Sequence, residues 1–212
     1  MKRPLAALMI LMSIALAIAV FLPAARTVQA GRASDVKLQA QAQTEDGADL
    51  GKAAAYCVKK GGEVDVREPY FNTNDDPKNW FRLSGDRQFC KFTSKKDGSR
   101  IHVLLSTLYS EQPTLAALAY YAEVPYNEIC SGNPASCYCS QIGGTDLFGG
   151  INLNGGGWVM KSDPVDTTLE ACIFPDMSTI DSWGLTYHQF GGIIRGKNLA
   201  NVLRYPNPYG KK

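Results

Sequence analysis

The chain has 212 residues, of which 45% are hydrophobic and 20% charged, and its formal net charge at pH 7 is +2. This length allows one or two small domains with a modest core. Lys2, Arg3 and Arg26 precede residue 31 and no acidic residue does, so the remaining chain holds 19 of the 22 basic side chains against all 20 acidic ones. A nearly neutral chain has no general attraction to phosphate backbones or anionic lipids, which argues against nucleic acid as a partner.

The first thirty residues have the pattern of a secretory signal peptide. Lys2 and Arg3 precede an apolar run over 5–22, and small residues lead up to Ala30. We therefore predict a signal peptide over 1–30 and a secreted protein, extracellular or periplasmic. Because the apolar run just reaches membrane-spanning length, an uncleaved N-terminal anchor is the alternative, and it is the one membrane contact expected. The polar segment 31–49 predicts a flexible linker.

Two parts of the chain resemble each other. Cys57 and Cys90 are 33 residues apart, and so are Cys139 and Cys172. A glycine pair follows the first cysteine of each couple at the same distance. We therefore predict two tandem repeats, a degenerate one over 50–127 and a better preserved one over 128–210. The predicted fold class is α+β, with each repeat a helix, antiparallel strands and two further helices.

Local patterns predict the elements of the first repeat in chain order. An alanine-rich helix over 52–60 ends at a glycine pair, and alternation over 63–67 indicates a strand. A loop is expected over 69–78, followed by a hairpin of strands 80–83 and 88–92. Apolar residues at helical spacing over 101–108 predict a helix, and Pro113 opens another.

The second repeat has clearer boundaries. Asn133 can cap a helix that begins at Pro134 and ends at Gly143. The segments 158–160 and 169–174 indicate paired strands. Ser178 and Asp181 have the spacing of a capping box, which predicts a helix from there onward, and a last short helix is expected over 199–203. The short link between the repeats favours their close packing.

The six cysteines favour disulfides, because the chain is predicted to be exported and the count is even. The equal spacing favours Cys57–Cys90 and Cys139–Cys172, which leaves Cys130 for Cys137. A rival pairing joins Cys130 to Cys139 and Cys137 to Cys172. We expect no zinc site, because the Cys-x-Cys spacing is unusual for zinc and the chain has only two histidines.

Other candidate sites have simpler explanations. The cluster Asn72, Asn74, Asp75 and Asp76 lacks the glycine and distal glutamate of a calcium loop, so a solvated turn is expected. The triple glycine over 155–157 opens a strand where a phosphate-binding loop opens a helix. We therefore expect no metal and no cofactor.

Histidines and tyrosines supply the remaining candidates. A Ser178, Asp181 and His188 hydrolase is conceivable, although both partner residues are explained by helix capping. The tyrosines near the repeat ends indicate a contact surface or packing between the repeats. These tyrosines are Tyr120, Tyr121, Tyr126, Tyr205 and Tyr209.

The second repeat resembles a family of bacterial envelope domains of unknown function, loosely labelled haemolysin-like. The resemblance rests on Asn133–Ser136, Tyr138–Cys139, Gly143–Gly144 and Cys172–Asp176, continuing at Ser178, Trp183 and Leu185. Met177 and Ile180 depart from it, where the family has a glycine and a further cysteine. The resemblance implies an exported, disulfide-containing, non-enzymatic domain and carries over no catalytic residue.

The sequence therefore predicts a secreted or cell-surface binding or structural module without enzymatic activity, with a protein or glycan partner at the cell envelope. Two alternatives are a small secreted hydrolase that uses His188 or His102, and an inhibitor of an exported enzyme.

Overall fold

The fold is known from a computed structural model that describes residues 44–45, 48–127, 131–146, 154–189 and 198–210. The predicted signal peptide and most of the predicted linker lie outside these residues. The end of the linker does not stay irregular, because β1 (Thr44–Glu45) and β2 (Ala48–Asp49) form a short antiparallel hairpin. Asp49 then caps α1 by accepting a hydrogen bond from the Lys52 backbone N–H at 3.2 Å.

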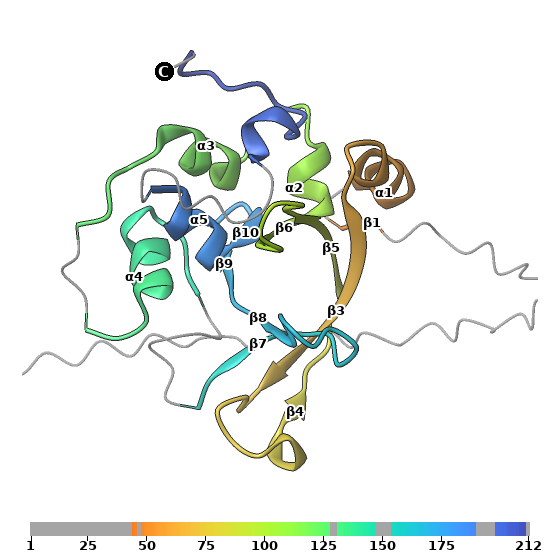
Figure 1. Ribbon diagram of the computed structural model, residues 1–212, viewed down its shortest axis with the longest axis vertical. Coiled ribbons are helices and arrows are strands. Elements are labelled where there is room, and N and C mark those ends of the chain that lie inside the picture. Colours follow the sequence, from red (N-terminus) through yellow and green to blue (C-terminus); the bar gives the residue numbers. More distant parts are fainter. Residues whose placement is uncertain (1–43, 46–47, 128–130, 147–153, 190–197, 211–212) are drawn as a thin grey trace, which may run out of the picture. The chain divides into compact units, whose positions relative to one another are not determined.

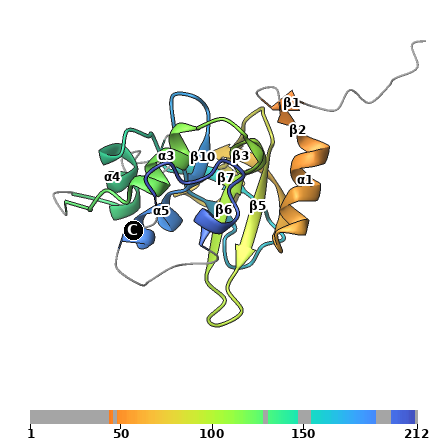
Figure 2. The same ribbon diagram turned by 90° about the horizontal axis from the view of Figure 1, so that it is seen from above.

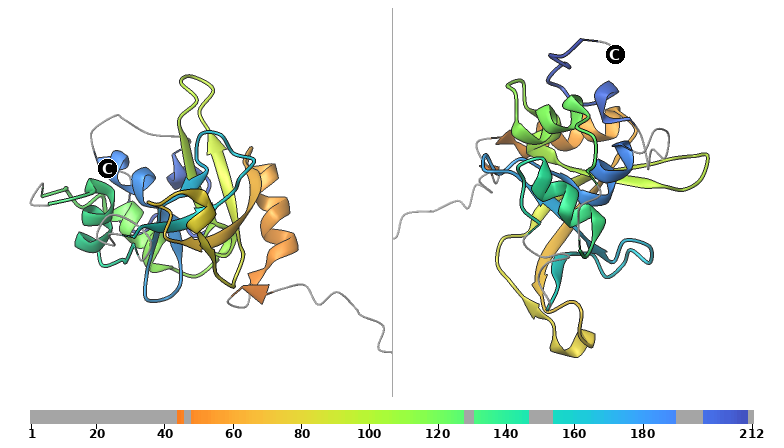
Figure 3. Two further views of the ribbon diagram at one scale, coloured as in Figure 1. Left: turned by 90° about the horizontal axis from the view of Figure 1, so that it is seen from below. Right: turned by 90° about the vertical axis from the view of Figure 1, so that its left-hand side faces the viewer.

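After the β1–β2 hairpin, the first half of the folded region contains four strands of different lengths and three helices. After α1 (Leu50–Lys59) come β3 (Glu63–Phe71), a 3-10 turn η1 (Pro77–Asn79) and β4 (Phe81–Arg82). The strands β5 (Arg87–Thr93) and β6 (Arg100–Leu104) follow, and then α2 (Leu105–Tyr109) and α3 (Leu115–Ala122). β5 and β6 form a hairpin that extends beyond the neighbouring elements (Figure 3).

The second half has shorter strands. It begins with α4 (Pro134–Gln141) and continues through β7 (Gly156–Val159), β8 (Thr168–Leu169), β9 (Ala171–Ile173) and β10 (Thr179–Asp181). It ends with α5 (Ser182–Gln189) and the 3-10 turn η2 (Leu199–Asn201). Residues 40–212 group as one compact unit.

Strands from both halves form a single antiparallel sheet in the order β8-β7-β3-β5-β6-β10-β9. In addition, β4 pairs with the C-terminal end of β3. The halves meet twice, where β3 pairs with β7 and where β6 pairs with β10. The two end strands of this order, β8 and β9, are separated in the chain only by Glu170. The sheet therefore curls into a nearly closed ring of strands, which Figure 1 views almost end on.

The two faces of this ring carry different chemistry. The helices lie outside it, with α1 and α4 on opposite sides (Figures 1 and 2). Between the helices and the strands lies the larger apolar core, which includes both disulfides, Phe92, Val103 and Ile180. A smaller apolar cluster contains Phe89, Leu104 and Trp158. Phe89 pairs with Asp65 across the ladder, so this cluster shares the ring interior with charged side chains.

Several predicted elements are confirmed and others are wrong. The helices at α1 and α4 are confirmed, and the strand predicted over 158–160 is β7, which begins two residues earlier and ends one residue earlier. The helix over 101–108 is wrong in its first part, which is β6, because the strand is bound on both sides by β5 and β10. The helix predicted from Ser178 begins only at Ser182, because Thr179–Asp181 pair with β9. Strand β4 pairs with β3, so the predicted hairpin with 88–92 is also wrong.

Both predicted long disulfides are confirmed. Cys57 is bonded to Cys90 and Cys139 to Cys172, which excludes the rival pairing. Cys137 is also disulfide-bonded, and its predicted partner Cys130 lies outside the described residues. Each bridge packs against a glycine. A Cβ at Gly62 would overlap Cys90 Sγ and lie 2.9 Å from Cys57 Sγ, and a Cβ at Gly144 would overlap Cys172 Sγ and lie 3.0 Å from Cys139 Sγ.

Candidate functional site

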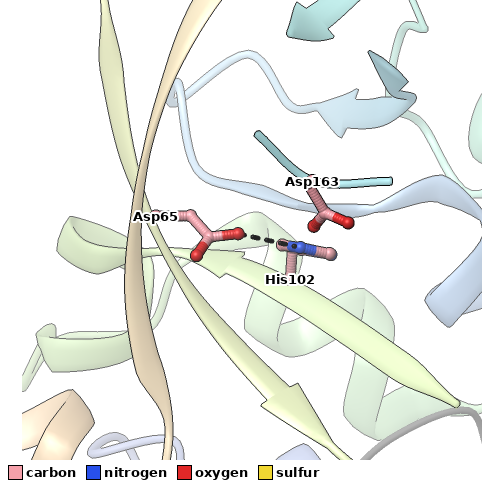
Figure 4. Close-up of side chains that lie close together, drawn as sticks. All are labelled: Asp65, His102 and Asp163. Atoms are coloured by element: carbon pink, nitrogen blue, oxygen red, sulfur yellow. Dashed lines mark ion pairs between the residues drawn. The ribbon is translucent and has the colours of Figure 1, made fainter. Parts of the chain in front are cut away.

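A group of buried charged side chains lies inside the ring. Arg67 is 0% exposed, and its Nη2 atom lies 3.1 Å from Asp65 Oδ2, 3.2 Å from Asp163 Oδ2 and 3.2 Å from His102 Nε2. Figure 4 shows Asp65, His102 and Asp163 pointing toward a common centre from two strands and a loop. We call Asp65, Arg67, His102 and Asp163 the interior charge cluster.

The same three side chains resemble a metal site when Arg67 is ignored. One ligand atom from each of Asp65, His102 and Asp163 lies within 4.8 Å of the others. The Arg67 guanidinium already occupies their shared centre, donating hydrogen bonds to both carboxylates and contacting the imidazole. A built-in organic cation thus takes the place that a metal ion would need. The residues present do not fit a metal.

His102 links the cluster to the second half of the chain. Its Nδ1 atom lies 3.4 Å from Asp181 Oδ2, and its Nε2 atom lies 3.4 Å from Asp65 Oδ2. Burial by itself would lower the pKa of His102, but the carboxylates of Asp181 and Asp65 outweigh burial and raise this pKa. The imidazole is fully buried, so it supports the sheet joint and has no exposed edge for a substrate.

Arg100 extends the cluster toward the surface. Its Nη1 atom lies 2.7 Å from Asp163 Oδ1 and 3.3 Å from Asp166 Oδ2. Burial opposes ionisation of Asp163, but backbone N–H groups of Asp166 and Val165 and the Arg100 guanidinium hold the pKa of this carboxyl well below its usual range. One cation is thus shared between two carboxylates at the edge of the ring.

A surface cleft of about 330 Å³ opens beside Arg100. We call it the Trp183 cleft. Trp183 and Tyr187 stack along one part of it with ring centroids 5.6 Å apart and planes at 24°. Asp181, which binds His102 on one side, also lines the cleft. The residues that line it include Arg100, Asp166, Glu170, Asp181, Trp183 and Tyr187.

Glu170 is the least usual of these carboxyl groups. Burial raises its pKa, and the negative charges of Asp146 and Asp181 raise it further, while hydrogen bonds from Asn133 and Trp183 act in the opposite direction. The Asn133 side-chain amide donates to Oε1 at 3.0 Å and to Oε2 at 2.8 Å. The carboxyl group is therefore held in one place before any ligand arrives.

The Asn133–Ser136 motif explains how this part of the cleft is built. Asn133 caps α4 by accepting a hydrogen bond from the Ala135 N–H at 2.9 Å, while its amide nitrogen holds Glu170. Ser136 donates to Asp146 at 3.0 Å, and Ser182 donates to the same carboxylate oxygen at 3.2 Å. The motif thus fastens α4 to the start of α5 and to the residue that closes the ring.

The predicted hydrolase residues are not brought together. His188 stacks on Tyr120 with ring centroids 4.1 Å apart and lies 3.4 Å from Glu123. Ser178 Oγ accepts a hydrogen bond from the Ala116 N–H at 2.9 Å, so it caps the start of α3. Asp181 accepts from the Gly184 N–H at 2.9 Å and contacts the other histidine, His102. Each residue has a separate structural task.

The predicted tyrosine surface is mostly packing. Tyr120 and Tyr121 are buried, and their hydroxyl groups bind Asn198 at 3.3 Å and the Tyr205 carbonyl at 2.6 Å. Tyr126 packs edge-on against Tyr138, and Tyr205 packs against the larger core. Tyr209 is 53% exposed. Of this set, Tyr209 is the member that is free to contact a partner broadly.

The loop over 72–79 is exposed and satisfies itself. Asn72 and Asn79 donate side-chain hydrogen bonds to Asp75, and the Trp80 indole donates to the Asp75 carbonyl. This agrees with the solvated turn that the sequence predicted. Gly155 has a φ of 70° and lies against Asn74, which fits the predicted tight turn before β7.

Sequence reasoning missed the interior charge cluster and most of the cleft. Asp65 and Arg67 alternate with Val64 and Val66, and this alternation predicts a strand without saying which of its faces is buried. In the structure the charged face is the buried one, since Val66 is 54% exposed and Arg67 is 0% exposed. The one available signal was the presence of opposite charges two residues apart in a strand, and it does not say which face is buried.

Comparisons with known proteins provide no relative. No protein family, no curated protein and no solved structure matches the chain. Within the part of the chain that the structure describes, no helix is both long and apolar enough to span a membrane.

Proposed function

We propose that the chain is an exported, non-enzymatic binding module that holds its partner at the Trp183 cleft. The observation that carries this proposal is the cleft itself, where a stacked aromatic pair stands beside carboxyl groups that are already fixed by other residues. Ligand sites commonly combine an aromatic wall with a few firmly positioned polar groups. Disulfides fit an oxidising compartment, which supports export.

The anchoring of the polar groups favours binding over catalysis. Arg100 is held by Asp163 and Asp166, Asp181 by His102 and Gly184, and Glu170 by Asn133. A pre-organised site of this kind loses little conformational entropy when a ligand arrives. The hydrolase alternative needs an accessible histidine in the site, and His102 is buried while His188 contacts Tyr120 and Glu123.

We also propose that the two halves are tandem repeats of one unit. Support comes from the paired disulfides, from the glycine packed on each, and from matching turns in which Asp97 binds Ser99 and Asp176 binds Ser178. The resemblance to haemolysin-like envelope domains concerns the second unit. In this proposal duplication supplies the scaffold, and the cleft arises where the copies meet.

The test is capture of a partner from envelope extract with the oxidised full chain and two tryptophan variants. Trp183→Ala removes the aromatic wall, and Trp80→Ala, at a tryptophan between η1 and β4 that does not line the cleft, is the matched control. We expect recovery of the partner to fall at least tenfold with Trp183→Ala and to stay unchanged with Trp80→Ala, with both variants folded by circular dichroism. Equal recovery by all three proteins would contradict the proposed site.

The alternatives predict different results in the same assay. Replacing the histidine of the predicted hydrolase set, His188→Gln, leaves capture intact if the chain is a binding module, because His188 is not among the residues that line the cleft. If the chain inhibits an exported enzyme, the captured partner is one enzyme in stoichiometric amount, and its activity falls on addition of the chain.

A further inference from the structure

The residues around the Trp183 cleft have an unbalanced charge. Arg100 is the one cationic side chain among the described residues that line the cleft, and it is already shared by Asp163 and Asp166. Among the described residues that line the cleft, three carboxyl groups stand against this one cation, and they belong to Asp166, Glu170 and Asp181. Asp181 contacts the buried His102 on its inner side, and Glu170 accepts hydrogen bonds from the Asn133 amide.

Two groups that titrate near this excess respond in the direction it predicts. The pKa of His102 is raised by Asp181 and Asp65 in spite of burial. The pKa of Glu170 is raised by burial and by Asp146 and Asp181. Both shifts favour the protonated form, which is the effect that neighbouring carboxylates have on a titrating group.

An aromatic wall is the second, independent feature. Trp183 and Tyr187 are both partly exposed, and they present a stacked pair of rings to the cleft beside the carboxyl groups. A positive charge over the face of an indole or phenol ring is attracted by the ring quadrupole. Carboxyl groups and aromatic rings together are the chemistry that recognises organic cations.

Resting on the proposed binding function, we infer that the Trp183 cleft binds an organic cation, a primary ammonium or guanidinium group. Its volume of about 330 Å³ lies at the small end of ligand pockets, which suits one side-chain-sized group. An anion would be repelled by Asp181 and Glu170. A neutral sugar could stack on Trp183 and bind the carboxyl groups, but it would leave their charge uncompensated.

The experiment is calorimetric titration of the oxidised full chain with cadaverine, arginine amide, a lysine-containing neutral pentapeptide, and an uncharged trisaccharide. We expect the cations to bind and the trisaccharide to bind at least tenfold more weakly. The titrations with the free diamine and with the peptide distinguish two sources of the cation, a small free amine and a basic side chain of a protein. Tighter binding of the peptide assigns the site to a basic side chain of a protein partner, and tighter binding of cadaverine assigns it to a free amine.

Variants locate the binding and keep the inference testable. Glu170→Gln and Trp183→Ala should each weaken cation binding at least tenfold, whereas Glu68→Gln, at a partly exposed carboxyl group outside the cleft lining, should leave it unchanged. If Glu170→Gln does not fold, the pH dependence of cation affinity in the unaltered protein provides a second test. Cation binding favours ionised Glu170, so affinity should rise with pH through the pKa of this residue, with release of a proton to the buffer.

The outcomes separate this inference from the proposed function. If the trisaccharide binds more tightly than the cations and Trp183→Ala removes its binding, the cation inference is overturned and the binding module stands. If no probe binds and Trp183→Ala leaves partner capture unchanged, both are overturned. Cation binding that Glu68→Gln and Glu170→Gln weaken equally reflects general surface charge and also overturns the inference.

Discussion

The two disulfide-linked helix–strand units are alike in their scaffold and different in their chemistry. In each, a helix ends at a glycine with positive φ, Gly61 or Gly143, and the next glycine packs on the disulfide. Yet after the matching turns the first unit has His102 and the second has Asp181, and these face each other across the β6–β10 joint. Backbone geometry is thus shared, while side chains at the joint are complementary.

This difference teaches where function can arise in such a molecule. Positions that hold the helix to the sheet accept little change, because a Cβ at Gly62 or Gly144 has no space. Positions at the joint face a partner strand from the other half, so opposite charges there stabilise the pairing. The Trp183 cleft lies beside this joint, and Asp181 both contacts His102 at the joint and lines the cleft.

The largest expected effect on stability comes from removing the buried cation of the interior charge cluster, compared with removing a cation at the surface. Arg67→Leu leaves Asp65 and Asp163 buried without their shared cation, so we expect a loss of about 3–5 kcal/mol in the free energy of unfolding. Arg82→Leu is the control, since Arg82 pairs with Glu68 and Asp86 at the surface, and about 0–1 kcal/mol is expected. Urea unfolding measures both free energies. A loss for Arg67→Leu that is as small as the loss for Arg82→Leu would show that the interior charge cluster does not stabilise the fold.

Removal of either disulfide tests the likeness of the two units. Because both bridges close loops of equal length, the chain-entropy account predicts about 3–4 kcal/mol for each. The variants are Cys57→Ala with Cys90→Ala, and Cys139→Ala with Cys172→Ala. Chemical denaturation under oxidising conditions gives the two losses. If one loss in the free energy of unfolding is less than about half of the other, native packing around one bridge matters more than chain entropy.

The glycines give a smaller and more local comparison. Gly62→Ala and Gly144→Ala should each destabilise the fold by about 1–3 kcal/mol, because the added methyl group overlaps a disulfide sulfur. Gly51→Ala is the control in α1, where the nearest atom is Asp49 Oδ1 at 3.4 Å and alanine favours the helix. Thermal unfolding would contradict the comparison if one of the two glycines tolerated alanine.

The smallest effect concerns pH at the joint. Because the folded pKa of His102 is raised, its contribution to stability is fully present below its ordinary pKa of about 6.5 and is lost as pH rises through the folded value. His102→Gln should therefore flatten the fall in stability above that pH. His188, whose pKa is lowered by burial, is the control, and His188→Gln should leave this alkaline slope unchanged. Denaturation at several pH values measures the slopes.

Much of the scaffold follows from local patterns. The equal cysteine spacing, the cap at Asn133 and the glycine stops are short-range features, and they predicted both long disulfides and two helices correctly. The wrong secondary-structure predictions concern segments whose local pattern is compatible with both a helix and a strand. Apolar residues over 101–108 fit a helix by spacing, but β5 and β10 on either side make the first part a strand, because pairing satisfies its backbone hydrogen bonds.

The site could not be predicted in the same way. The sequence predicts Asn133 as a helix cap, but its hydrogen bond to Glu170 depends on a residue 37 positions away in the chain. Asp163 and Arg100 lie in segments without a motif, and they meet because the curled sheet brings the turn between β7 and β8 against the start of β6. No spacing rule describes such a meeting, since it depends on the curvature of the whole sheet.

By itself the sequence determined the disulfide-linked units, their caps and their stops, because these depend on residues close in the chain or on an exact repeat of spacing. Tertiary structure alone decided that both units share one ring and that Arg67 is buried while Val66 is exposed. It also decided that an aromatic pair stands beside fixed carboxyl groups. The physical reason is that strand alternation defines two faces, and only the curling of the sheet determines which face is enclosed.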